Sequence, residues 1–127
     1  MKFFLISLGG VAGANARFFL GQFVTEKFSK SAFPWGTFLI NITGSLLLGL
    51  FLELSRLHKW DDNWRLLLAV GFLGAYTTFS TFEYESVKLM MNGQWAVALR
   101  YILGSVIIGL AGVWFGILAG RFWGTRV

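Results

Sequence analysis

Four apolar segments dominate the chain, and each is long enough to cross a lipid bilayer. They cover approximately residues 3–24, 33–54, 64–90 and 95–122. A spanning helix needs about 20 apolar residues, so four spans take roughly 80 residues. The connections in this 127-residue chain are then short, at residues 25–32, 55–63 and 91–94. The pattern predicts an all-α integral membrane protein in which residues 1–127 form a single four-helix membrane domain.

The composition excludes several other classes of protein. Charged residues make up only 13% of the chain, about half the share of an average soluble domain. The apolar runs are continuous rather than alternating, which disfavours a β-barrel. The chain has no Cys and one His, so a disulfide framework and a Cys or multi-His metal site are excluded. No His, Cys or paired carboxylate lies at membrane depth, so we expect neither an enzyme nor an organic cofactor.

Basic residues are spread almost evenly over the two ends of the predicted bundle. The end with the N-terminus, the second loop and the C-terminus carries Lys2, Arg56, Lys59, Arg65, Arg121 and Arg126. The other end carries Lys27, Lys30 and Lys88, with Arg17 and Arg100 nearby inside apolar segments. The net charge of +5 therefore suggests no nucleic-acid surface. It either anchors loops to anionic lipid or directs insertion so weakly that both orientations occur.

The third segment contains an unusual polar stretch that reads GFLGAYTTFSTF from Gly71 to Phe82. Gly and β-branched Thr weaken a helix, and hydroxyls offer the backbone competing partners. Two structures are compatible with this stretch: a helix break near Gly74 to Thr78, or a continuous helix whose hydroxyls bond to their own carbonyls. At a break, freed carbonyls can hold a hard cation such as sodium, while the start of the next half-helix favours an anion.

Other polar residues lie where lipid is expected, and such residues are candidates for function. Asn41 can donate to an anion or join two helices. Arg17 can extend to a headgroup. Glu83 and Glu85 follow the polar stretch near the membrane surface, where they either shape a vestibule or solvate the helix end.

Two residue pairs share helix faces. Phe79 and Phe82 lie three apart, and their ring edges can face an anion or pack in the core. Tyr101 and Ser105 lie four apart on the fourth segment. Small residues at four-residue spacing predict close helix contacts, and they are Gly9, Gly13, Gly112, Gly116 and Gly120.

The stretch from Gly71 to Phe82 closely resembles the signature of the Fluc (CrcB) fluoride channels. Further matches follow in order along nearly the whole chain: GGVAG with Arg17, PWGT with Asn41, and NG with Tyr101 and Ser105. The resemblance implies a dual-topology homodimer of antiparallel four-helix subunits in the cell (inner) membrane. It also implies passive fluoride export through two pores along the dimer interface.

The resemblance assigns roles to individual residues. A structural sodium ion at the dimer centre would bind the backbone carbonyls of Gly74 and Thr77. The fluoride pore would be lined by Asn41, Phe79, Ser80, Thr81, Phe82, Tyr101 and Ser105. Arg17 would lie by the vestibule and Glu85 near the end of the pore. Gly109 and Val113 stand where many members extend the hydroxyl track of the fourth helix.

Two alternatives belong to other functional classes. A small multidrug-type exporter exchanges cations for protons at a carboxylate in its first helix, and residues 3–24 contain no Asp or Glu. A non-transporting membrane assembly subunit would need the small-residue contacts but not the polar stretch. A fluoride pathway does need it, because donors must replace the ion's hydration shell without holding the ion too tightly.

Overall fold

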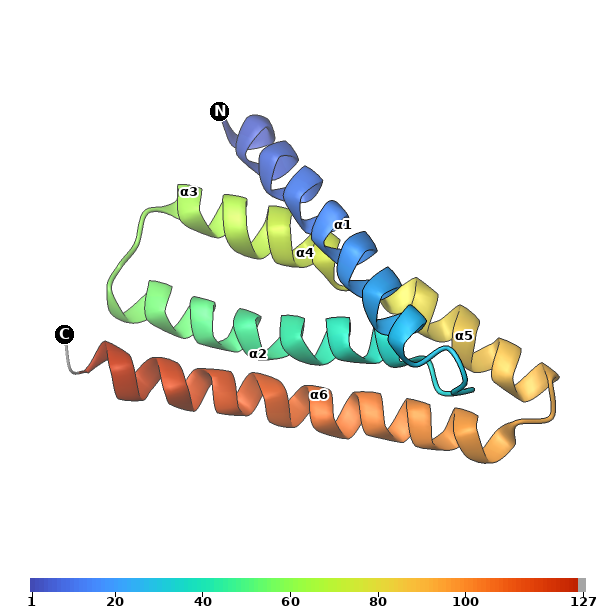
Figure 1. Cartoon of the computed structure of the whole chain (residues 1–127). Helices are drawn as coiled ribbons and strands as arrows, with labels where there is room; N and C mark the ends of the chain where they lie inside the picture. Colours follow the sequence, from blue (N-terminus) through green and yellow to red (C-terminus); the bar gives the residue numbers. More distant parts are fainter. Residues whose placement is uncertain (126–127) are drawn as a thin grey trace.

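The computed structural model describes residues 1–125 and consists of long helices packed side by side (Figure 1). Their bounds are α1 Lys2–Lys27, α2 Trp35–Leu57, α3 Asp62–Trp64, η1 Arg65–Leu73, α4 Gly74–Tyr76, α5 Phe79–Met91 and α6 Trp95–Gly124. Between residues 1 and 125 there is no strand. Arg126, which was counted in the charge comparison, lies outside the described residues.

The four predicted spans are confirmed. Helical segments Lys2–Lys27, Trp35–Leu57, Asp62–Met91 and Trp95–Gly124 are each long and apolar enough to cross a membrane. Many of their large apolar side chains point outward; Phe3 on α1 is 86% exposed and Leu110 on α6 is 68% exposed. Extensive exposed apolar surface marks a surface that contacts lipid or another protein rather than water.

Small residues allow the helices to approach closely. α2 and α6 run parallel along their whole length (Figure 1), and a Cβ on Gly116 of α6 would collide with the carbonyl oxygen of Leu46 on α2. In the same way, a Cβ on Gly9 of α1 would collide with the carbonyl oxygen of Leu67 on η1. The predicted small-residue contacts are therefore present on both helix pairs.

The third span is broken at Thr77 and Thr78. Both residues are extended, with φ −82° and ψ 159° at Thr77 and φ −149° and ψ 118° at Thr78. The break thus lies at the C-terminal edge of the predicted range. Gly74 itself remains helical, with φ −63° and ψ −34°. Of the two structures compatible with the sequence, the chain adopts the broken helix.

The part of the third span before the break is wound more widely than an α-helix, and the sequence did not predict this. Residues Arg65–Leu73 form a π-helix, in which each N–H bonds to the carbonyl five residues earlier. This form is rare, occurs mostly as single-turn bulges within α-helices, and is frequent at functional sites. The π-helix extends into the first three residues of the polar stretch and ends shortly before the break.

Candidate functional site

Asn41 of α2 fills the gap that the helix break leaves in the backbone hydrogen bonding. Its Nδ2 donates to the Thr78 carbonyl at 2.9 Å, and its Oδ1 accepts from the Thr78 N–H at 2.8 Å. Unpaired backbone groups are tolerated at membrane depth only where protein or water satisfies them. One side-chain amide therefore satisfies both backbone groups of Thr78, as expected of a residue that joins two helices.

Thr78 in turn begins the second half-helix. Its Oγ1 accepts from the Thr81 N–H at 3.3 Å and donates to the Thr81 Oγ1 at 2.9 Å. This is the usual N-cap arrangement for a threonine. The start of α5 consequently lies at the break, where the positive end of its dipole favours an anion.

A cavity of about 320 Å³ lies beside the break, between α2, the broken span and α6. It brings together the predicted residues Asn41, Gly74, Thr77, Phe79, Phe82 and Ser105. These residues come from three spans, and the fold gathers them at one place. Among residues 1–125, no Lys or Arg lines this cavity.

The two phenylalanines occupy different positions at this cavity. Their ring centroids lie 5.8 Å apart, but Phe79 is 70% exposed and Phe82 only 9%. Phe82 also packs edge-on against Tyr101, with 5.1 Å between ring centroids. Phe82 is therefore fixed in the interior, whereas Phe79 lies on the open side of the cavity.

Ser105 offers a hydroxyl for which we find no partner among residues 1–125. Its Oγ is buried and lines the cavity. A buried hydroxyl without a partner is unfavourable by about 1–3 kcal/mol, and such groups in native structures usually have a reason. Ser105 is thus available to donate to a ligand in the cavity.

Arg17 of α1 contacts the backbone at the break. Its Nη1 donates to the Thr77 carbonyl at 3.4 Å, and it lines a second cavity of about 380 Å³ with Thr78 and Thr81. Thr81 lies in this second cavity and not in the first. Ser80 is exposed and lines neither of the two.

Glu85 is held by two hydroxyls instead of extending freely from the helix end. Tyr101 donates to its Oε2 at 2.7 Å and Thr37 donates to its Oε1 at 2.9 Å. Tyr101 is completely buried and Glu85 half-buried. The interpretation that Glu85 merely solvates the helix end is wrong, because α2 and α6 supply its partners. Sequence reasoning missed Thr37, although it precedes Asn41 by one helical turn.

Sequence reasoning also missed an acidic residue near the other end of α2. Glu53 is 7% exposed near the end of α2 and accepts from Arg56 at 2.7 Å and from Arg121 of α6 at 2.9 Å. The carboxylate lies against Gly120, where a Cβ would come within 3.0 Å of the Glu53 Cβ. This cluster connects the parallel ends of α2 and α6, away from the helix break.

Side-chain metal ligands do not gather anywhere among the described residues: no group of three His, Asp or Glu forms a site. Backbone oxygens are available at the break instead. The Thr78 N–H, which in a continuous helix would bond to the Gly74 carbonyl, donates to Asn41. The Gly74 carbonyl is therefore released from its helical partner, beside the first cavity.

Comparison with known proteins places this geometry in context. A family model described as "CrcB-like protein, Camphor Resistance (CrcB)" matches residues 4–117. A relative from Koribacter versatilis is 49% identical over 88% of this chain and 89% of its own. One from Acidobacterium capsulatum is 43% identical over 95% and 97%, and one from Clostridium acetobutylicum is 47% identical over 91% and 95%.

All three relatives are named as fluoride-specific ion channels, the third as "FluC 2". A channel is not an enzyme, so the expectation of a non-enzymatic protein is confirmed. These names give no support to a multidrug exporter or an assembly subunit. The family model covers α2, the broken third span and most of α1 and α6, and the relatives align over most of their length. This chain therefore belongs to the CrcB-like family.

Proposed function

We propose that this chain forms a channel that conducts fluoride passively across the cell (inner) membrane. The observation that carries the proposal is the cavity at the helix break, where Asn41, Phe79, Phe82 and Ser105 converge. The names of the relatives, fluoride-specific ion channels, support the choice of ion.

The chemistry of the cavity suits a small, strongly hydrated anion. Fluoride must exchange water for other donors on entering, and it must leave again. The Ser105 hydroxyl and the start of α5 supply donors, and the positive edges of the Phe79 and Phe82 rings add attraction without a formal charge. Since no Lys or Arg in the described part of the chain lines the cavity, no fixed cation from this part traps fluoride there.

A second copy of the chain in the opposite orientation would complete the pathway. The cavity opens on the side where Phe79 is 70% exposed, so one chain supplies only part of the wall. The nearly even spread of basic residues is compatible with insertion in both orientations. An antiparallel homodimer with two such pathways follows as part of the proposal.

A structural sodium ion fits the backbone at the break. Carbonyl oxygens suit hard cations. The Gly74 carbonyl has lost its helical donor, and the Thr77 carbonyl keeps one lone pair besides the one that accepts from Arg17. Two carbonyls per chain are too few for one ion, whereas two antiparallel chains would supply four. Sodium bound there would fix the two broken helices relative to each other.

Efflux from liposomes tests the proposed function directly. Vesicles loaded with potassium fluoride and containing the purified protein are expected to release fluoride when valinomycin lets potassium follow. Release equal to that from empty vesicles would refute the proposal. A chloride-loaded arm shows whether the release is specific to fluoride.

Substitution of the ring residues tests the location of the pathway. Phe82→Ile and Phe79→Ile are expected to reduce fluoride efflux strongly, because an aliphatic side chain lacks the positive ring edge. Phe19→Ile is the matched control, since Phe19 on α1 is 65% exposed and lines neither cavity. Equal efflux from all three variants and the unchanged chain would remove both rings from the pathway.

A further inference from the structure

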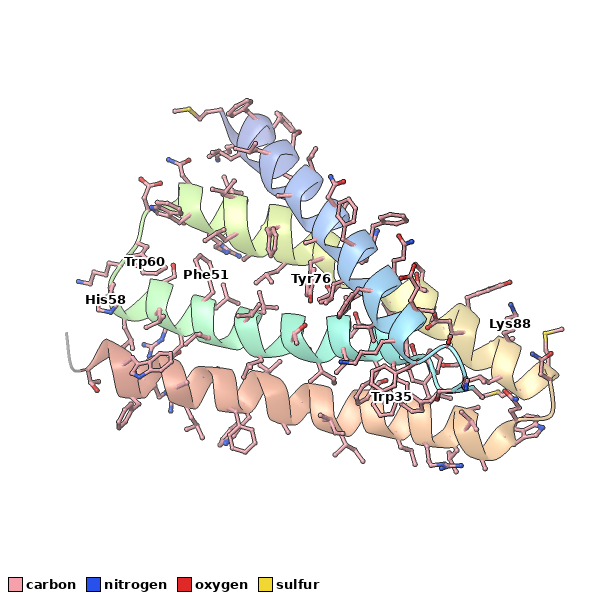
Figure 2. The ribbon with its side chains drawn as sticks, in the orientation of Figure 1. Trp35, Phe51, His58, Trp60, Tyr76 and Lys88 are labelled. Carbon is pink, nitrogen blue, oxygen red and sulfur yellow. The ribbon has the colours of Figure 1, made fainter. Side chains whose placement is uncertain are left out.

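The half-helix that ends at the break has its own attachment to α2, separate from the bonds that Asn41 makes to Thr78 on the downstream side. Tyr76 is the last residue of α4 and only 6% exposed. Its hydroxyl lies 2.8 Å from the Thr43 Oγ1 of α2, and Figure 2 shows its ring in the space between α4 and α2. Neither residue lines the cavity at the break, so this contact acts on the pathway only through the backbone.

The direction of this hydrogen bond follows from the single proton of the threonine hydroxyl. The Thr43 Oγ1 lies 2.7 Å from the Leu39 carbonyl and 3.1 Å from the Ile40 carbonyl of its own helix. The threonine therefore donates to its own backbone, and Tyr76 donates to the threonine. Consecutive bonds of this kind polarise and strengthen one another.

Each residue around the break is met by one residue from a single turn of α2. The pairs are Tyr76 with Thr43, Thr77 with Gly44, and Thr78 with Asn41. Gly44 belongs to this set because a Cβ there would collide with the Thr77 Cγ2. On the upstream side the phenol supplies the hydrogen bond to α2, since the Asn41 amide bonds to the downstream residue Thr78.

The tyrosine ring itself is held in a fixed plane. It stacks on Phe72, one helical turn earlier, with 5.9 Å between centroids and 7° between planes. A rigid ring bonded at its tip to α2 resists rotation of α4 about its own axis. Rotation of α4 about its axis would carry the carbonyls of Gly74 and Thr77 with it, because both residues are joined directly to this short helix.

We propose that the Tyr76–Thr43 hydrogen bond is a positioning contact, which sets the rotation of α4 and hence the direction of the carbonyls at the break. Its effect on fluoride conduction rests on the proposed function. Its effect on the backbone does not.

Hydrogen exchange tests the structural part with matched variants. Tyr76→Phe keeps the ring and its stacking but removes the donor; Thr43→Val keeps the shape but removes the acceptor; Thr43→Ser keeps the hydroxyl. Amides of residues 73–78 are expected to exchange about fivefold faster in the first two variants, the effect of losing one ordinary hydrogen bond. Thr43→Ser is expected to match the unchanged chain. Unchanged exchange in Tyr76→Phe, or faster exchange in Thr43→Ser, would overturn the proposal.

Fluoride efflux then tests the effect on the pathway. Tyr76→Phe and Thr43→Val are each expected to slow efflux, and the double variant is expected to be no slower than either, because both remove the same bond. Additive losses in the double variant, or efflux equal to the unchanged chain, would contradict a shared positioning contact. If the unchanged chain itself releases no fluoride, the proposed function fails, while the exchange experiment still decides on the contact.

Discussion

At the helix break, the side chain of Asn41 pairs backbone groups that are normally paired within a helix or a sheet. Its amide has one acceptor and a donor pair, and it uses both kinds of group on the backbone of Thr78. The fit requires an amide: a carboxylate has no donor for the Thr78 carbonyl, and an amine has no acceptor for the N–H.

Asn41→Ala is expected to destabilise the protein by roughly 2 to 4 kcal/mol, because it leaves two half-buried backbone groups of Thr78 unpaired. Unfolding in detergent mixtures of increasing denaturant strength measures this. Asn15→Ala is the control, since Asn15 is exposed and donates only to Val11 of its own helix; its effect is expected within about 0.5 kcal/mol. Equal effects of the two substitutions would contradict the role of Asn41.

A substitution at Ser105 is expected to change fluoride conduction without lowering the stability of the protein. Ser105→Ala removes a buried hydroxyl without a partner among the described residues, so the free energy of unfolding is expected to stay the same or rise slightly. Fluoride efflux is expected to fall about tenfold, since a hydrogen bond to a charged group is worth about 1.5 kcal/mol or more. Comparing efflux with unfolding in the same preparation checks both. A loss of stability with unchanged efflux would argue against a donor role.

At the level of helices, the close contact between α2 and α6, here called the seam, depends on glycine residues, which have no side chain. Gly116→Ala is expected to destabilise the protein by about 1 to 3 kcal/mol, because the new methyl group overpacks the seam against the Leu46 carbonyl. Gly104→Ala on the same helix is expected to have little effect, since its nearest neighbour is the Phe38 ring at an ordinary 3.7 Å. Thermal unfolding of the two variants in the same detergent decides between them.

The spans and the break could be predicted from the sequence because both depend on local properties. Apolar length defined the second span within a few residues, and Gly and hydroxyl residues signalled the break. The partners of the break were not predictable in the same way. Asn41 and Thr78 are separated by 37 positions, and only packing decides which residue of α2 faces Thr78. The π-helix at Arg65–Leu73 also had no local signal, because an apolar run winds equally well as an α-helix.

The same difference between local sequence signals and long-range contacts applies to the site residues. The family resemblance named several of the residues that line the cavity. The fold brings three of these, Asn41, Phe82 and Ser105, together there. Their roles in conduction stay predictions. The bonds from Thr37 and Tyr101 to Glu85 join three helices, and no spacing within one helix reveals them.

For the molecule as a whole, the proposed dual topology is open to a direct measurement. The chain contains no Cys, so a single introduced cysteine reports its own side of the membrane. Ser29→Cys and His58→Cys place reporters in exposed loops at opposite ends of the bundle. If insertion is weakly directed, an impermeant maleimide is expected to label about half of each variant in sealed vesicles. Labelling of one variant only would establish a single orientation.

Met1 and the end of α6 lie at the same end of the bundle, because the chain crosses an even number of times (Figure 1). In a pair of opposed copies, all chain ends of one copy would face one compartment and those of the other copy the opposite one. A tandem gene duplication with a short linker could not encode such a pair as one polypeptide. A fused pair of this kind would require one more crossing between its halves, about 20 additional apolar residues.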